Sequence, residues 1–239
     1  MPPLTQEVVK LHIPDGFLDA KTYGTLWGVS GGTIAYALYK VKDTLDEKKI
    51  PLLGITAAFI FAAMMLNFPV AGGTSGHVVL ALLACLLLGP WEGFLTIVVV
   101  LAVQCFFFAD GGLTALGANI FNMAIVAGLV SYALLKVTEK PLAKRLGEKT
   151  ALLSSAAVFA WVGVVLASAA AAIELALSGT VPFHITFPAM VGVHSLIGIG
   201  EGLITVVVLA VVLQTRPDLV NAYQGPALAP AVVAKEAQA

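Results

Sequence analysis

The sequence predicts an all-α integral membrane protein, and three observations lead to this. Hydrophobic types make up 59% of the 239 residues, charged types only 11%, and the mean hydropathy is +0.96. A soluble domain carries about 25% charged residues. The net charge is −1, which gives no reason to expect nucleic acid as a partner. The two cysteines lie inside apolar stretches without CxxC spacing, so the sequence contains no sign of a disulfide framework.

Apolar stretches separated by polar residues predict about seven transmembrane helices. A cluster of lysines separates the first stretch from the second, an Asp-Gly-Gly turn separates the fourth from the fifth, and a second basic cluster follows the fifth. The stretches cover residues 23–41, 51–68, 77–89, 91–109, 113–137, 151–177 and 188–214.

The basic residues predict the orientation of these helices. With seven spans, 11 of the 13 lysines and arginines fall on one side of the membrane, and only Lys10 and Lys21 fall on the other. Basic residues are enriched on the cytoplasmic side. We therefore expect a cytoplasmic C-terminus and an N-terminus outside, in the cell (inner) membrane of a bacterium or archaeon.

The third stretch is too short to span a bilayer. Its 13 residues, from His77 to Gly89, rise about 20 Å as a helix, against a hydrocarbon core about 30 Å thick. The glycine-rich run 71–76 before it is therefore expected to dip below the outer surface. Such a sunken loop, ending in a histidine at a helix start, is typical of a small-ion site. The alternative is a flexible surface loop followed by a tilted short helix.

Two histidines are candidate metal ligands. His12 lies in a stiff, turn-forming segment with Pro14 and Asp15-Gly16. His77 is predicted to begin a helix, where the positive end of the helix dipole favours a neutral imidazole. Neutral imidazole is a common ligand for nickel and cobalt. Two histidines can also meet by chance, and His184 has no assigned role.

Further polar residues lie in apolar stretches, where they are expected to face the protein interior. His194 and Glu201 are seven residues apart and therefore lie on one face of the last helix. They would form a relay, a subunit contact or a hydrogen-bonded structural pair. Glu174 has the same alternatives. Asn119 and Asn122 would hydrogen-bond a metal-ligating histidine or tie helices together.

These fragments together resemble the CbiM/NikM family, the substrate-capture components of energy-coupling-factor transporters for nickel and cobalt. The matching motifs occur in order over about residues 11–215. They are His12-Ile13-Pro14-Asp15-Gly16-Phe17-Leu18, Gly72-Gly73-Thr74-Ser75-Gly76-His77, Gly117-Ala118-Asn119-Ile120-Phe121-Asn122-Met123, Gly192-Val193-His194 and Glu201-Gly202.

The resemblance implies an outward-facing site that holds Ni(II) or Co(II) as transported substrate, with no permanently bound cofactor. In that family the ligands are the terminal amine, the backbone and ring nitrogens of a histidine at the second position, and a distal histidine. The metal ligands here would be His12 and His77. The residues implied around them, in supporting or structural roles, are Asp15, Thr74, Ser75, Asn119, Asn122, His194 and Glu201.

The chain departs from the family pattern before His12. Position 11 is leucine and ten residues precede it, so no free amine lies beside His12. One explanation is a misassigned start, since a leucine codon can initiate bacterial translation, and Leu11 would then be the initiator position. The other is that residues 1–10 are a genuine extension and the site is remodelled or lost.

The resemblance also implies partners. The chain has no P-loop motif, so it is not expected to be an enzyme. Separate ATPase subunits would act through a membrane coupling subunit, with a small accessory membrane subunit as a further partner. The alternatives are a structural or accessory membrane subunit without metal binding, and a haem protein using His77 and His194. Residues 216–239 are expected to form a disordered cytoplasmic tail.

Overall fold

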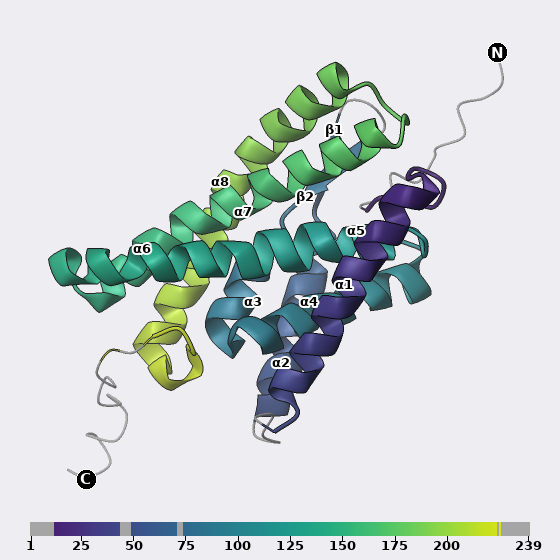
Figure 1. The fold of residues 1–239 in the computed structure, drawn as a ribbon. Helices are drawn as coiled ribbons and strands as arrows, with labels where there is room; N and C mark the ends of the chain where they lie inside the picture. Colours follow the sequence, from purple (N-terminus) through teal and green to yellow (C-terminus); the bar gives the residue numbers. More distant parts are fainter. Residues whose placement is uncertain (1–11, 44–48, 71–73, 224, 226–239) are drawn as a thin grey trace, which may run out of the picture.

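A computed structural model describes residues 12–43, 49–70, 74–223 and 225, and the side chains of residues 68–70 and 74 are not described. The described part is mostly helical (Figure 1). Its elements are α1 (Ala20–Val41), α2 (Ile50–Met64), β1 (Asn67–Val70), β2 (Thr74–His77), α3 (Ala81–Leu88), α4 (Pro90–Phe108), α5 (Leu116–Ile120), the π-helix η2 (Phe121–Val130), α6 (Ser131–Leu146), α7 (Glu148–Leu177), α8 (Phe183–Thr215) and the 3₁₀ turn η3 (Pro217–Leu219).

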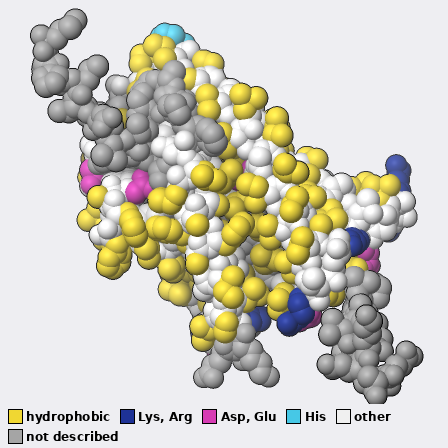
Figure 2. Space-filling view, turned by 180° about the vertical axis from the view of Figure 1, so that it is seen from behind, with side chains coloured by type: hydrophobic (Ala, Val, Ile, Leu, Met, Phe, Trp, Pro, Cys, Tyr) yellow, Lys and Arg dark blue, Asp and Glu magenta, His cyan; other side chains and the backbone are white. Residues whose placement is uncertain are grey.

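Four of the described helices are long and apolar enough to cross a membrane. They are Pro90–Phe108, the continuous helix Leu116–Leu146, Glu148–Leu177 and Phe183–Thr215, and α2 is a shorter apolar helix. Their outward faces remain apolar, as at Leu196, which is 71% exposed, and Leu203, which is 64% exposed. Figure 2 shows hydrophobic side chains over much of one face. Such a surface suits lipid rather than water, and the chain is a multi-pass membrane protein.

The short helix α3 lies at the centre of the fold. All eight of its residues are buried, and it packs against α4, η2 and α7. Gly93 of α4 makes this approach close, because a Cβ there would lie 2.5 Å from the backbone nitrogen of Cys85. The expected short apolar helix is therefore present, wrapped by protein on every side.

The segment before α3 differs from the expectation. His77 does not begin a helix: it ends β2, and α3 begins four residues later at Ala81. Strands β1 and β2 form an antiparallel hairpin in which Asn67 pairs with His77. The expected sunken loop of residues 71–76 is thus partly strand, and residues 71–73 lie outside the described part of the chain.

Gly76 allows the hairpin to lie directly on α8. A Cβ at Gly76 would be 2.6 Å from Ile197 Cδ1 and 3.0 Å from His194 Cε1. Since successive residues of a strand face opposite sides, His77 points away from α8.

The C-terminal segment also differs from the expectation, because residues 217–223 are packed instead of forming a loose tail. Asn221 and Ala222 donate backbone hydrogen bonds of 3.1 and 3.0 Å to Leu87 and Leu86 at the end of α3. Val220 is 2% exposed. Residues 224 and 226–239 lie outside the described residues.

The N-terminal segment and the starts of α2 and α7 lie at different ends of the molecule (Figure 1). At one end the N-terminal segment meets the α7–α8 turn, where the Thr180 hydroxyl donates to the carbonyl of Phe17. At the other end Lys49 lies 3.8 Å from Glu92, and Lys136 donates to the carbonyl of Ala222. The predicted basic side and the N-terminal segment therefore lie at opposite ends.

Candidate metal centre

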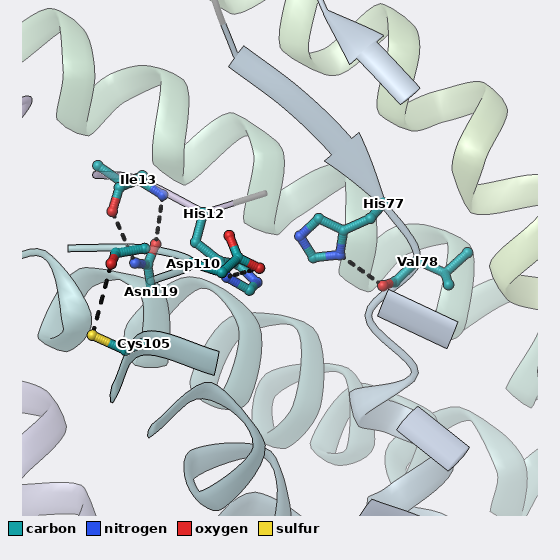
Figure 3. A network of polar contacts seen from close by, with 8 residues as sticks. His12, Ile13, His77, Val78, Cys105, Asp110 and Asn119 are labelled. Carbon is teal, nitrogen blue, oxygen red and sulfur yellow. Dashed lines mark hydrogen bonds and ion pairs between the residues drawn. The ribbon is translucent and has the colours of Figure 1, made fainter. Parts of the chain in front are cut away.

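The segment that follows His12 is fastened to the start of the helix Leu116–Leu146. The Ile13 backbone N–H donates to Asn119 Oδ1 at 3.1 Å, and Asn119 Nδ2 donates back to the Ile13 carbonyl at 3.2 Å. The Gly112 N–H donates to the same carbonyl at 2.9 Å. Asn119 therefore supports the site through the backbone beside His12 rather than through a histidine ring (Figure 3).

Asp15 fixes the same segment two residues after Ile13. Its Oδ1 accepts hydrogen bonds from the Thr114 backbone N–H at 2.7 Å and from the Thr114 hydroxyl at 2.6 Å. The contact is close enough to require glycine at position 112, because a Cβ there would lie 2.1 Å from the Asp15 nitrogen. Asp15 is thus a structural clamp on the segment that carries His12.

His12 is buried and held by an acidic residue. Its side chain is 2% exposed, and its Nδ1 lies 3.4 Å from Asp110 Oδ2. Within the described residues, His12 Nε2 is buried without a hydrogen-bond partner. A buried ring nitrogen without a donor or acceptor suits a site that binds a ligand.

His77 reaches the same place from the hairpin. The centroids of the His12 and His77 rings are 4.9 Å apart and their planes meet at 88°. His77 Nδ1 lies 2.8 Å from the Val78 carbonyl, which favours the proton on Nδ1 and leaves the lone pair on Nε2. Figure 3 shows the His77 ring extending from the end of β2 toward His12 and Asp110.

Burial, rather than a helix terminus, accounts for a neutral His77. Desolvation, with a smaller contribution from the nearby His12, lowers the pKa of His77 to about 3. The expected cause, the dipole of a helix starting at His77, is absent because that residue lies in a strand. The conclusion that its imidazole is available as a lone-pair donor remains.

His194 and Glu201 are brought near the hairpin but not into contact with each other. The His194 Nδ1 bonds the Met190 carbonyl at 2.8 Å. Glu201 accepts from the backbone N–H groups of Val79 and Leu80. The strand at Gly76 lies against the His194 ring, so protein fills the position that a haem between His77 and His194 would need.

The remaining predicted residues have separate places. Asn122 Nδ2 donates to Glu174 Oε2 at 2.8 Å, joining η2 to α7. Ser75 is buried in β2, and the side chain of Thr74 is outside the described set. His184 is exposed at the start of α8. Leu11 and residues 1–10 lie outside the described residues.

Asp110 is a residue of the candidate site that no sequence motif singled out. It is 8% exposed and faces His12, from which 98 positions separate it in the chain. A carboxylate directly after the apolar stretch 91–109, followed by two glycines, is the signal that could have identified it.

The described side chains supply two imidazoles but not a complete metal cage. No group of three histidine, cysteine or acidic residues is arranged to hold one ion within the described part of the chain. A metal bound between His12 and His77 would thus take its other ligands from backbone atoms, the chain terminus or water.

Comparison with known proteins identifies the family. The family model described as cobalt uptake substrate-specific transmembrane region, CbiM, matches residues 12–219. The chain belongs to the CbiM family. The match includes His12, His77, Asp110 and Asn119, so the site described above lies inside the CbiM region.

Individual relatives agree with this assignment to the CbiM family. A protein of Archaeoglobus fulgidus, provisionally named fused nickel transport protein NikMN, is 42% identical over 94% of this chain and 73% of its own length. The fused nickel transport protein NikMN of Rhodobacter capsulatus is 31% identical over 91% of this chain and 66% of its own. A crystal structure described as a truncated transition metal transporter has a TM-score of 0.76 at 33% identity, covering 85% of this chain and 99% of that one.

Proposed function

We propose that this protein captures Ni(II) or Co(II) at the outer face of the cell membrane, as the substrate-specific component of an energy-coupling-factor ABC transporter. As a CbiM family member it is a membrane component of cobalt and nickel transport. The observation that carries the capture role is the meeting of His12 and His77, two buried imidazoles whose ring centroids are 4.9 Å apart.

The two histidines fit a borderline transition metal. Imidazole nitrogen is a preferred ligand of Ni(II) and Co(II), and both ring Nε2 atoms are open to a metal if the Nδ1 atoms carry their protons. A second mode uses the backbone nitrogen of His12. A compact chelate with that nitrogen requires His12 Nδ1, which would displace the ring from Asp110.

Whether residues 1–10 are present decides which ring nitrogen of His12 would bind the metal. If translation begins at position 11, the terminal amine lies next to His12 and anchors the chelate through Nδ1. With residues 1–10 present, no free amine adjoins His12, and the Nε2 mode remains. We propose that the chain begins at position 11 in its native cell, which gives the ligand set that the family resemblance implies.

The orientation and partners follow from the same proposal. Seven membrane-embedded helical segments would place the N-terminus outside, and the basic end with Lys49 and Lys136 at the cytoplasm, where ATPase subunits act. The metal site lies at the opposite end. A coupling subunit in the membrane would transmit the ATPase movement, with a small accessory membrane subunit as a further partner.

Metal content tests this function. Nickel and cobalt are measured by elemental analysis on two purified forms, the 239-residue chain and a form starting with methionine at position 11. In the form that binds metal, His77→Ala is expected to remove it, while His184→Ala, at an exposed histidine, retains it. Metal in the short form alone supports both capture and the internal start.

Absence of metal from both forms contradicts the capture role. The second function, a structural or accessory membrane subunit without cargo, would then be favoured. That outcome also predicts that His77→Ala assembles with its partner subunits as the unmodified protein does.

A further inference from the structure

A carboxylate lies buried between α7 and η2 without a basic partner. Glu174 is 6% exposed, and among the residues that the structure describes no lysine, arginine or histidine forms an ion pair with it. Its Oε2 accepts a hydrogen bond from Asn122 Nδ2, and its Oε1 accepts none from the described residues. Ionisable side chains inside membrane helices are costly and are generally functional, each with a specific partner.

Two further oxygen atoms of this region are buried without a partner. Because Asn122 donates its Nδ2 to Glu174, the orientation of the amide is fixed and the remaining atom is the acceptor Oδ1. Within the part of the chain that the structure describes, Asn122 Oδ1 and Thr186 Oγ1 both lack a hydrogen bond. Asn122 also lies in the π-helix η2, and such segments are rare and frequent at functional sites.

The packing of α7 on α8 brings Thr186 to the level of Glu174. The two helices run antiparallel, side by side (Figure 1). Gly198 of α8 packs on Trp161 of α7, where a Cβ on the glycine would lie 2.8 Å from the indole. Followed back along α8 and forward along α7, this register places Thr186 opposite Ile173, the neighbour of Glu174. Thr186 is 3% exposed, so both side chains face the protein interior at this level.

We propose that Glu174, Asn122 and Thr186 form a binding site for one sodium ion. Carboxylate, amide and hydroxyl oxygens are the ligands that hard cations take. A single positive charge neutralises the one carboxylate, whereas a divalent ion would leave an uncompensated charge in an apolar region. The small number of protein oxygens favours Na⁺ over the larger K⁺. A proton on Glu174 would be shared by only two of the three oxygens, whereas a metal ion contacts all of them.

This site is separate from the His12–His77 pair but is connected to it. Asn122 lies three residues after Asn119 in the same continuous helix, and Asn119 holds the backbone of Ile13. An ion that ties η2 to α7 and α8 therefore stabilises the part of the bundle on which the N-terminal segment rests. The sodium ion is a structural ligand rather than cargo, and it binds with or without nickel or cobalt.

Binding of radioactive sodium to the detergent-purified 239-residue protein tests the site, with choline chloride keeping the ionic strength constant. The unmodified protein is expected to bind one ion saturably. Its unfolding temperature should rise by about 3–6 °C when sodium is at about ten times its Kd. Glu174→Gln removes the charge and should abolish binding. Thr186→Val has nearly the same shape without the hydroxyl and should weaken binding about 10–100-fold.

Glu148→Gln and Thr215→Val are the matched controls. Both residues are exposed, one on α7 and one on α8, so both variants should bind sodium as the unmodified protein does. If Glu174→Gln does not fold, Thr186→Val carries the test, because it keeps the carboxylate.

Equal unfolding temperatures in sodium and choline chloride, without saturable sodium binding, overturn the site and indicate that Glu174 carries a proton. Unchanged affinity in Thr186→Val, or equal losses in the two controls, also overturns it. These measurements use no nickel or cobalt, so their outcome is independent of the proposed capture function.

Discussion

Glu201 in α8 accepts a hydrogen bond of 2.5 Å from the backbone N–H of Leu80, a residue 121 positions earlier in the chain. The other carboxylate oxygen accepts from Val79 at 2.7 Å. Both N–H groups lie at the entrance to α3, directly after His77. One carboxylate of α8 therefore sets where α3 begins and where His77 ends the hairpin.

Removal of this carboxylate is expected to destabilise the protein. Glu201→Leu leaves two buried N–H groups without acceptors, each at a cost of about 1–3 kcal/mol. The unfolding temperature in detergent should fall, and nickel or cobalt affinity should fall with it. Glu201→Gln keeps one acceptor oxygen, so its unfolding temperature and metal affinity should lie between those of Glu201→Leu and those of the unmodified protein. A Glu201→Leu variant that unfolds at the same temperature as the unmodified protein would contradict this role.

In the 239-residue form, where His12 would bind through Nε2, Asp110 is expected to hold the His12 ring in its metal-binding orientation. A carboxylate on the far nitrogen fixes the tautomer and raises ligand basicity, so Asp110→Asn should weaken metal binding about 10–100-fold. Asp218→Asn is the control, since the Asp218 side chain is exposed and pairs with Arg216. Affinity that stays the same or increases in Asp110→Asn would show instead that His12 binds through Nδ1, in competition with Asp110.

Gly112 is expected to be essential for seating the N-terminal segment. In Gly112→Ala the new Cβ would lie 2.1 Å from the Asp15 nitrogen and 2.6 Å from the Pro14 carbonyl carbon. Overpacking of this kind costs about 1–3 kcal/mol, or roughly a tenfold to hundredfold loss of affinity if the bound segment carries the cost. Gly192→Ala in α8 has open space around it and should bind metal normally.

The metal-free protein is expected to lose stability in mild acid through His77. The pKa of His77 is about 3 in the folded protein, against about 6.5 for an unfolded histidine. Between these values the unfolded state binds the proton more tightly, so stability is complete above pH 6.5 and decreases as the pH falls toward 3.

Comparison with a variant isolates this contribution. From pH 6.5 to pH 5 the unmodified protein should lose about 2 kcal/mol more than His77→Gln, at about 1.4 kcal/mol per pH unit. Denaturant unfolding in detergent measures it. Equal acid sensitivity of the two proteins would show that His77 is not held neutral by burial.

The long helices and the histidine pair could be predicted from the sequence because each rests on local information. An apolar stretch such as 151–177 fixes a helix by its composition, and α7 covers Glu148–Leu177. His12 and His77 were selected for their side-chain chemistry and through the family motifs, and the structure places their rings in contact.

The rest depends on contacts between distant segments. Strands β1 and β2 have four residues each, too few for an alternating pattern to show. Glu201 sets the start of α3. Asp110 lies beside His12 only because the N-terminal segment folds back onto the start of the helix Leu116–Leu146. The packing of Asn221 and Ala222 on α3 could not be inferred from a segment rich in proline and alanine.

Leu80 itself adopts a left-handed backbone, with φ at 56°. For a residue with a Cβ this conformation is less stable than the right-handed one by about 1–2 kcal/mol, and the Glu201 hydrogen bonds hold it in place. The Glu201 carboxylate thus keeps the residues between His77 and Ala81 out of the helix. The place of His77 opposite His12 therefore depends on a side chain of α8, more than 120 positions further along the chain.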